Sequence, residues 1–320
     1  MTISRIFIGI IDYPGALQSA VQGLREMFVA ANRICVQQNL NIAFDIEIYN
    51  VEQVATFSNK TFLKDKQQSN SLHVVILPPC LEGEYYICPD QHLKAWLLEQ
   101  RSQGVILCSV CAGAFILAAC GLLDHRPATT HWGLTERFNK TYPKVHLDSN
   151  KILINDTDLM TAGGLMAWLD LGLELVAQFT QARIMRLLGK YLIVDTGSRE
   201  QRYYRSFVPA LNHGDQAVLT VQHHLQVNFA KNISMRDLAA LSCLGERTFL
   251  RRFVKATELK PSQYLQQLRI QKACDRIESS HDSVELIATK VGYEDVSAFR
   301  KVFIKTMGLT PREFRHRFAH

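Results

Sequence analysis

The residues best suited to chemistry are a cysteine and a histidine twenty positions apart. Cys111 follows the apolar run 105–110 and precedes Ala112-Gly113-Ala114, and His131 lies within the sequence Thr-Thr-His-Trp. A residue with small neighbours at a sharp strand-to-helix turn adopts a strained backbone that lifts its side chain above the sheet. The N-terminus of the following helix can lower the pKa of such a thiol. The pattern indicates a nucleophile, a ligand contact or a small buried thiol at Cys111.

Other groupings of thiols and imidazoles are less favourable. Cys108 and Cys111 spell C-x-x-C, but their side chains point in different directions on a strand, whereas a redox pair begins a helix. His223 and His224 are adjacent on a predicted helix and diverge, and no second Cys/His pair lies at zinc-ligand spacing. We therefore expect no metal and no cofactor.

A second group of candidate functional residues lies in residues 234–317, where one pattern of apolar and aromatic residues occurs twice. Four apolar or aromatic positions recur 50 residues later, and an earlier pair recurs 49 residues later. The recurring residues are Phe249, Phe253, Pro261 and Tyr264, then Phe299, Phe303, Pro311 and Phe314, with Leu238-Ala239 matching Ile287-Ala288. Such a repeat predicts two copies of one supersecondary unit.

Each copy predicts a short helix, a tight turn and a second helix with two inward phenylalanines and a basic outer face. The outward residues that we predict to contact DNA are Arg247, Thr248, Arg251, Arg252 and Lys255, then Ser297, Arg300 and Lys301. Arg247 and Arg251 can reach base edges, whereas Arg252, Lys255 and Arg300 are predicted to hold phosphates. A charged face alone is typical of a solvated bundle helix, but the repeat and the turn spacing favour recognition helices in the major groove.

The net charge supports this division of the chain. The formal net charge is +6, and residues 215–320 hold 17 Lys and Arg against 11 Asp and Glu, whereas residues 1–214 hold 19 of each. A basic segment beside a neutral one is typical of a nucleic-acid-binding domain joined to another domain.

Apolar runs that alternate with helical patterns precede the basic segment. Strands are predicted at 5–11, 44–49, 73–77 and 105–110, and helices at 16–34, 91–101, 112–123 and, as one long helix, 165–189. This alternation predicts an α/β domain with a parallel sheet covered on both faces. We predict domains at 1–194 and 215–320, the second all-α, joined by a linker at 195–214.

Several classes of protein are disfavoured. No apolar run approaches the ~20 residues that a membrane span needs. The N-terminal run ends in Asp-Tyr-Pro-Gly, which predicts a strand entering a turn and not a signal peptide. Eight cysteines without framework spacing favour the reducing cytoplasm.

The repeat resembles the DNA-binding domain of the AraC/XylS family of bacterial transcription regulators, which has two helix-turn-helix units joined by a long helix. The resemblance covers about a hundred residues and rests on the recurring positions above, with Arg252-Phe253, Val291-Gly292-Tyr293, Gly308 and Thr310-Pro311. Two positions depart from the family pattern, because Glu258 stands where Gly is usual and Lys260 where Ser or Thr is usual.

Residues 3–190 resemble the PfpI and class I glutamine-amidotransferase-like superfamily, which implies a flavodoxin-like doubly wound sheet. The resemblance rests on residues 109–115 and 128–132, and in that superfamily the elbow Cys and the following His are the reactive pair. Together the two domains resemble the GlxA-type subgroup of regulators. This resemblance, with the elbow geometry, places a ligand site at Tyr13, Cys111, Ala112, His131 and Trp132.

Two functions remain to be weighed. The first is a transcription regulator with a small-molecule-sensing domain that forms a homodimer, acts on double-stranded DNA and works with RNA polymerase. The rival is a PfpI-like cysteine hydrolase or amidase tethered to DNA. Catalytic members place a Glu just after the first strand, whereas this chain has Asp12 before a proline-containing turn. We therefore expect no catalysis, and an effector among nitrogen-containing metabolites.

Overall fold

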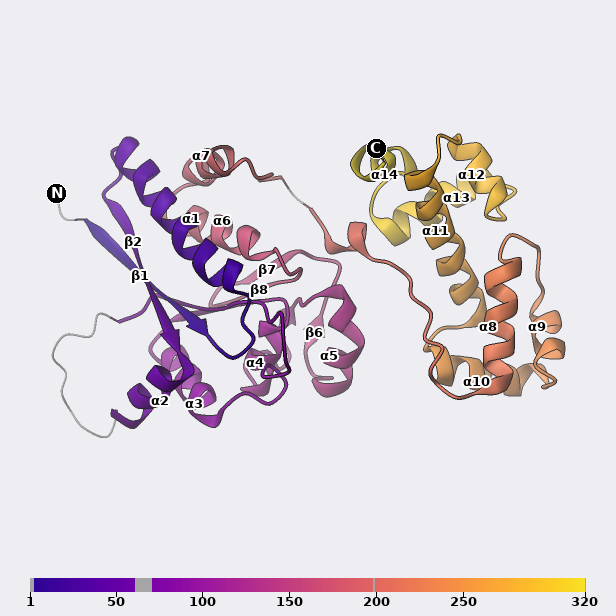
Figure 1. The fold of residues 1–320 in the computed structure, drawn as a ribbon, viewed down its shortest axis with the longest axis horizontal. Helices are drawn as coiled ribbons and strands as arrows, with labels where there is room; N and C mark the ends of the chain where they lie inside the picture. The colour runs from indigo at the N-terminus through magenta and orange to yellow at the C-terminus, as the bar shows by residue number, and fades with distance from the viewer. Residues whose placement is uncertain (1–2, 61–70, 198, 320) are drawn as a thin grey trace. The chain divides into compact units, whose positions relative to one another are not determined.

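A computed structural model describes residues 3–60, 71–197 and 199–319, and the chain divides into two compact units, Met1–Gln201 and Arg202–His320 (Figure 1). We call them the N-terminal unit and the C-terminal unit.

The N-terminal unit is organised around one sheet, which has six strands within the described residues, in the order β2-β1-β3-β4-β8-β7. Its strands are β1 (Ser4–Asp12), β2 (Ile42–Asn50), β3 (Val74–Leu77), β4 (Ile106–Val110), β7 (Leu153–Asp156) and β8 (Leu159–Ala162). All neighbours pair in parallel except the edge strand β7, which is antiparallel to β8. The apolar run 74–77 is buried along its whole length, because helices cover both faces of this central strand.

Helices pack on both faces of the sheet (Figure 1). One face carries α1 (Gln18–Gln37), α6 (Trp168–Phe179) and α7 (Ala182–Leu192), and the other carries α2 (Val51–Lys60), α3 (Gln91–Ser102) and α4 (Gly113–Ala119). The predicted doubly wound, flavodoxin-like parallel sheet is therefore confirmed.

The single long helix predicted at 165–189 is wrong, because the chain breaks between α6 and α7. Thr180 ends α6 with φ −125° and ψ −104°, and its hydroxyl donates to the Val176 carbonyl. Gln181 has an extended backbone and is the N-cap residue of α7. A threonine side chain competes for helical carbonyls in this way, which a hydrophobic pattern does not reveal.

Shorter elements complete the unit between β4 and β7. They are β5 (Pro127–Ala128) and β6 (His146–Leu147), which pair in parallel, the 3-10 turn η1 (Trp132–Leu134) and α5 (Thr135–Thr141). Phe115 of α4 packs edge-on against Phe138 of α5, with ring centroids 4.8 Å apart. This contact fixes α5 beside the elbow that precedes α4.

The C-terminal unit is all-helical across its described residues, after the 3-10 turn η2 (Gln201–Tyr204) at the junction. Its helices are α8 (Gln216–Asn228), α9 (Met235–Leu241), α10 (Glu246–Thr257), α11 (Pro261–Ser279), α12 (Val284–Lys290), α13 (Val296–Met307) and α14 (Pro311–Phe318). Phe249 and Phe253 are buried in one hydrophobic core and Phe299 and Phe303 in a second. The long helix α11 contributes residues to both cores and joins the two helix-turn-helix units.

The turns of the two copies match in backbone conformation. Cys243 and Gly292 are 49 residues apart and both have a positive φ, of 55° and 87°. A Cβ on Gly292 would lie 2.5 Å from the Ala230 carbonyl oxygen, so only glycine fits there. No such contact is present at Cys243, whose side chain is exposed, so a non-glycine residue is tolerated in the first turn.

Residues 195–214, which we predicted to form a linker, pack against the two units in turn. Arg199 pairs with Asp170 of α6, and Gln201 is buried in the N-terminal unit. Phe207 packs against Tyr264 of α11, with ring centroids 5.2 Å apart. The chain passes from one unit to the other between Gln201 and Arg202.

Candidate ligand and DNA-binding sites

Cys111 occupies a strained turn between β4 and α4. Its φ is 57°, in the left-handed region, and its backbone N–H donates to the Ala162 carbonyl at 2.8 Å. A Cβ on Gly113 would lie 2.7 Å from the Leu77 carbonyl oxygen, so the turn approaches β3 more closely than a larger residue allows. The strained elbow predicted from the small neighbours of Cys111 is therefore present.

Burial disfavours the thiolate form of Cys111. It is 5% exposed, and burial raises its pKa to about 12, although the Ala112 backbone N–H acts in the opposite direction. The sequence indicates that the helix N-terminus can lower this pKa, but desolvation of the buried thiolate is the larger effect. At neutral pH the group is a thiol, which is a poor nucleophile.

His131 is half-buried beside the elbow, and burial lowers its pKa. Its Nδ1 accepts the Gly133 backbone N–H at 3.0 Å, so the neutral ring carries its proton on Nε2. No hydrogen bond joins His131 to Cys111 or to a carboxylate anywhere in the described ranges, and Asp12 instead accepts from Gln18. The imidazole is thus arranged to donate a hydrogen bond and not to take a proton from the thiol.

The other predicted ligand residues divide into buried and accessible ones. Tyr13 is 2% exposed, donates its hydroxyl to the Pro78 carbonyl and stacks on Tyr85, and Ala112 is also buried. Burial raises the pKa of Tyr13, with further contributions from Cys80 and Cys111 nearby. Trp132 is half-buried, and its ring centroid lies 5.2 Å from that of His131. His131 and Trp132 therefore have accessible surface, whereas Tyr13 and Ala112 are buried.

Thr130 and Gln201 connect the histidine segment to its surroundings. The Thr130 hydroxyl donates to the Cys111 carbonyl at 2.7 Å. The Gln201 side chain donates to the Thr130 carbonyl at 2.9 Å and accepts from the Trp132 backbone N–H at 3.2 Å. Sequence reasoning missed Gln201, because no local pattern marks a residue that contacts a segment 70 positions away.

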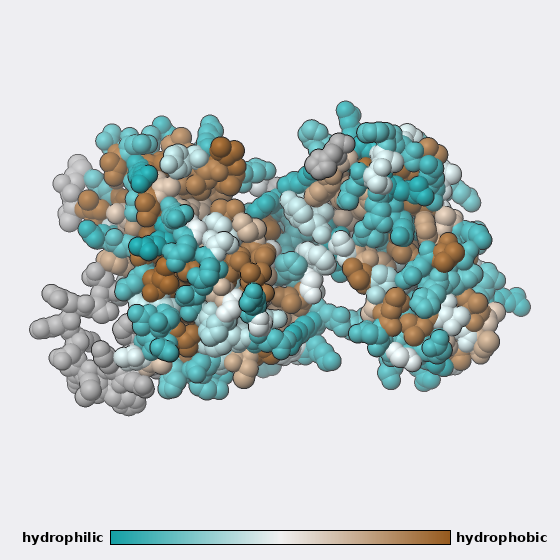
Figure 2. Space-filling model, viewed as in Figure 1, coloured by the Kyte–Doolittle hydropathy of each residue, from teal (hydrophilic) through white to brown (hydrophobic). Residues whose placement is uncertain are grey.

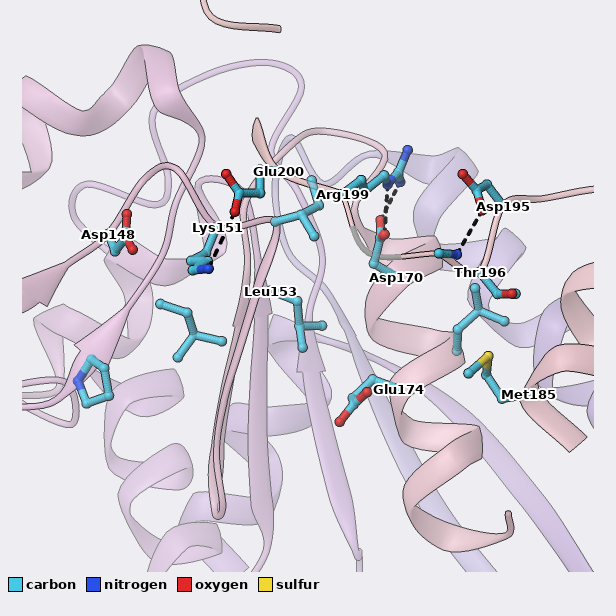
Figure 3. A pocket seen from close by; sticks show the side chains of 15 residues that line it. Asp148, Lys151, Leu153, Asp170, Glu174, Met185, Asp195, Thr196, Arg199 and Glu200 are labelled. Carbon is cyan, nitrogen blue, oxygen red and sulfur yellow. Dashed lines mark hydrogen bonds and ion pairs between the residues drawn. The ribbon is translucent and has the colours of Figure 1, made fainter. Parts of the chain in front are cut away.

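A separate cavity of about 580 Å³ lies at the edge of the sheet (Figure 3). Its walls come from β5, from β7 and the residues just before it, from α6 and α7, and from residues 195–197, 199 and 200. None of the predicted ligand residues lines it. The ion pairs Arg199–Asp170 and Lys151–Glu200 flank its opening, as Figure 3 shows. The segment that leads to the C-terminal unit therefore forms one wall of this cavity.

The first recognition helix, α10, exposes most of the predicted DNA-binding residues. Arg247, Thr248, Arg251 and Lys255 are all exposed, and no ion pair occupies the three basic side chains within the described part of the chain. The visible face of the C-terminal unit is largely hydrophilic, with smaller hydrophobic patches (Figure 2). These residues are free to meet a polyanion.

Arg252 differs from its neighbours on α10. Its Nε and one terminal nitrogen donate to the two carboxylate oxygens of Asp215, at 2.8 and 2.7 Å. Asp215 also caps α8 by accepting the Val218 backbone N–H. The structure therefore favours a positioning role for Arg252 over the phosphate contact that the sequence predicts.

The second recognition helix, α13, carries fewer basic groups. Ser297 and Lys301 are exposed on its outer face. Arg300 pairs with Glu285 of α12 at 2.7 Å, and both side chains are more than half exposed. Such a solvated pair is weak and exchanges readily for a phosphate.

Two further features bear on the class of protein. None of the helices in the described ranges combines the length and apolar character needed to cross a bilayer. In the same ranges, no group of three or more His, Cys, Asp or Glu side chains is arranged to hold a metal ion.

Comparisons with known proteins match each unit separately. A DJ-1/PfpI family model matches residues 33–178, and a helix-turn-helix domain model matches residues 238–317. The second match includes α10 and α13 together with the long helix between them.

Three curated relatives each match more than two thirds of this chain. The HTH-type transcriptional regulator ArgR of Pseudomonas aeruginosa is 29% identical over 225 residues, covering 69% of this chain and 67% of ArgR. GbdR of the same species is 25% identical over 221 residues, 69% of this chain and 60% of GbdR, so the match spans three fifths of that relative. GlxA of Rhizobium meliloti is 23% identical over 256 residues, 79% of this chain and 78% of GlxA. This chain therefore joins a DJ-1/PfpI domain to an AraC-type helix-turn-helix domain, and its homologues are HTH-type transcriptional regulators.

Proposed function

We propose that the protein is a one-component transcription regulator, in which the C-terminal unit binds double-stranded DNA and the N-terminal unit senses a small molecule. The observation that carries the proposal is the doubled helix-turn-helix with exposed Arg247, Arg251 and Lys255 on α10 and Ser297 and Lys301 on α13. Recognition helices of this kind enter successive major-groove segments about 34 Å apart. Such a protein acts in the cytoplasm, where the chromosome lies.

The decisive experiment is selection of genomic DNA fragments by the full chain, followed by titration of selected and scrambled fragments at several salt concentrations. Specific binding is typically ~10³-fold or more tighter than non-specific binding at physiological salt. Equal affinity for selected and scrambled fragments would leave only a non-specific polyanion binder.

The sensing site is proposed at the elbow, with His131 and Trp132 as contact residues above Cys111. The support is an Nε2–H donor beside an accessible indole face, a pair suited to a polar nitrogen-containing metabolite. A thermal-shift screen of amino acids, amines, betaines and amides tests this, because a ligand at 100 times its Kd adds ~2.7 kcal/mol of stability. A genuine hit loses its shift in Trp132→Ala, whereas a hit that keeps it binds elsewhere.

The rival hydrolase function receives no support from the site. Its nucleophile is a buried thiol with a raised pKa, and its histidine lacks a hydrogen-bonded orienting carboxylate within the described residues. Catalysis by a Cys–His pair requires both an activated thiol and an oriented base.

We also propose that the protein is a homodimer formed through the N-terminal unit, with RNA polymerase as a further partner on DNA. Exposed apolar side chains on and after α1 and α7 support the dimer, namely Val29, Val36, Tyr191 and Ile193. Solvent-exposed apolar groups of this kind favour burial against a partner. Sedimentation of the full chain at micromolar concentration should give a dimer, and Val36→Glu with Ile193→Glu should give a monomer.

A further inference from the structure

Gln201 is the last residue of the N-terminal unit and is nearly completely buried, with 2% of its surface exposed. Its amide nitrogen donates to the Thr130 carbonyl and to the Lys151 carbonyl, both at 2.9 Å, and lies 3.1 Å from the Thr129 hydroxyl. Its amide oxygen accepts the Trp132 N–H, and its backbone N–H donates to the Asn150 carbonyl at 2.8 Å. Both ends of the side-chain amide are therefore bonded inside the fold.

The fold reserves space for this side chain. A Cβ on Gly163 would lie 1.8 Å from the Gln201 amide nitrogen, so the glycine after β8 leaves room for it. A buried amide that loses its hydrogen-bond partners keeps the full free-energy cost of its desolvation. The position in which the Gln201 amide makes these bonds is therefore well defined. Withdrawal of Gln201 would leave the carbonyls of Thr130 and Lys151 without this donor.

The bonds made by Gln201 enclose the candidate sensing residue. Thr130 and Trp132 are the residues immediately before and after His131, and the Gln201 amide bonds to the backbone of both. Thr130 is in turn bonded through its hydroxyl to the carbonyl of Cys111. Any ligand that shifts the backbone at 130–132 must therefore lengthen or break bonds to Gln201.

Two neighbouring contacts hold the same segment without reaching the elbow. Arg199 pairs with Asp170 of α6, with Nε and Oδ1 2.9 Å apart, and Lys151 lies 3.5 Å from Glu200. These ion pairs tether the segment to α6 and to Lys151, which precedes β7, at the cavity of Figure 3. Gln201 differs from these two ion pairs because it bonds to residues 130 and 132, on either side of His131.

We propose that Gln201 is a positioning residue that couples the elbow site to the C-terminal unit, an inference that rests on the proposed sensing and DNA-binding functions. In the docked state the amide holds residues 130–132 and fixes the last residue of the N-terminal unit, one position before Arg202. In the released state the amide leaves its bonds and the segment gains freedom. A ligand at His131 and Trp132 shifts this equilibrium by its different affinity for the two states.

Limited trypsin digestion of the full chain measures docking without any effector, because Arg202 and Arg205 lie one and four residues after Gln201. Gln201→Ala should speed cleavage after these residues about tenfold, a change that corresponds to ~1.4 kcal/mol. Thr130→Val, at the other end of the chain of bonds, should speed the same cleavage about threefold, since coupling acts in both directions.

Hydrogen exchange at the Trp132 amide separates coupling from simple tethering. Gln201→Ala removes the acceptor of this N–H and should raise its exchange rate, whereas Gln201→Glu keeps an acceptor and loses the donors. Gln201→Glu should therefore give fast trypsin cleavage with a protected Trp132 amide. Asp170→Asn is the matched control, because it loosens Arg199 and should leave Trp132 exchange unchanged.

Wild-type cleavage and exchange rates in a Gln201→Ala protein with an unchanged circular dichroism spectrum would overturn the docking role. If Gln201→Ala does not fold, Gln201→Glu tests docking by trypsin cleavage alone, and a wild-type cleavage rate in that variant would overturn the docking role. The coupling role requires Gln201→Ala to change the Kd for fragments selected by the wild-type chain at least about threefold, and an unchanged Kd would overturn it. A chain that selects no DNA would instead refute the proposed function and leave the proteolysis result standing.

Discussion

Arg252 of the first recognition helix and Asp215, the N-cap of α8, form a two-point ion pair with distances of 2.8 and 2.7 Å. The pair joins a helix proposed to lie in the DNA groove to the helix that opens the C-terminal core. The Arg252 side chain is 38% exposed, so the pair holds α10 at the margin between the buried face that carries Phe253 and the solvent-exposed face. The neighbouring Arg251 is then presented outward on a helix that cannot turn freely.

Substitutions at Asp215 should separate its capping role from its ion pair. Asp215→Ala removes both the cap and the ion pair, and loss of the cap alone should lower the free energy of unfolding by about 1 kcal/mol. Asp215→Asn keeps a capping oxygen and should cost less. Chemical denaturation of the two variants at neutral pH measures the difference, and equal losses would mean that the cap contributes nothing.

The same pair predicts a dependence of stability on acid. The Arg252 hydrogen bonds lower the pKa of Asp215 below its ordinary value of 3.8, despite partial desolvation. A carboxyl group with a lowered folded-state pKa stabilises the fold above its unfolded pKa, and this contribution is lost as pH falls below about 4. Asp215→Asn should therefore flatten the decline in melting temperature between neutral pH and pH 3. A decline as steep as that of the wild type would show that other carboxyl groups dominate.

Arg251 and Lys255 should affect DNA binding in different ways. Arg251→Ala should weaken the free energy of binding to a selected fragment by about 1–3 kcal/mol and relax the sequence preference at one base pair. The reason is that Arg contacts guanine through two hydrogen bonds. Lys255→Ala should weaken the affinity for all DNA sequences alike and reduce the slope of log affinity against log salt concentration by about 1. Titration of single-base variants over several salt concentrations distinguishes the two. Equal weakening of selected and scrambled DNA by Arg251→Ala would rule out base reading by this residue.

Cys111 should resist alkylation at neutral pH. A pKa of about 12 leaves far less thiolate than in an ordinary thiol, so its reaction with iodoacetamide should be at least about a hundredfold slower than that of a free cysteine. The exposed Cys88 and Cys243 are controls within the same chain. Peptide mapping over a time course measures all three rates. Faster modification of Cys111 than of Cys243 would revive the hydrolase function.

The ends of the two recognition helices should respond oppositely to substitution. Glu258 ends α10 and Gly308 ends α13, both in the left-handed conformation, with φ of 58° and 76°. Glu258→Gly should stabilise the C-terminal unit by about 1 kcal/mol, because it removes the steric cost of a side chain at positive φ. Gly308→Ala should destabilise it by about 1–2 kcal/mol. Thermal denaturation measures both changes, and destabilisation by Glu258→Gly would mean that its side chain makes a compensating contact.

Many features of this protein follow from local sequence patterns. The 50-residue recurrence of Phe249 and Phe253 as Phe299 and Phe303 predicts two helix-turn-helix units, because burial of a helix face depends on residue spacing along one element. The small residues around Cys111 predict the strained elbow for a similar reason, since the conflict between side chain and backbone is local. The break at Thr180 lies at the limit of such reasoning, because a hydrophobic pattern does not show to which carbonyl a hydroxyl will donate.

Tertiary structure decided what the candidate functional groups can do. The sequence alone placed a thiol before a helix N-terminus, but the surrounding fold buries it and raises its pKa, because desolvation depends on residues distant in the chain. Likewise, Arg252 is one of several basic side chains in the sequence of α10, and only the fold places Asp215, 37 positions away, beside it. Gln201 gained its partners only when residues 129–132 and 151 were folded around it. Spacing in the sequence thus determined which faces are buried, whereas charge state and pairing were decided by long-range packing.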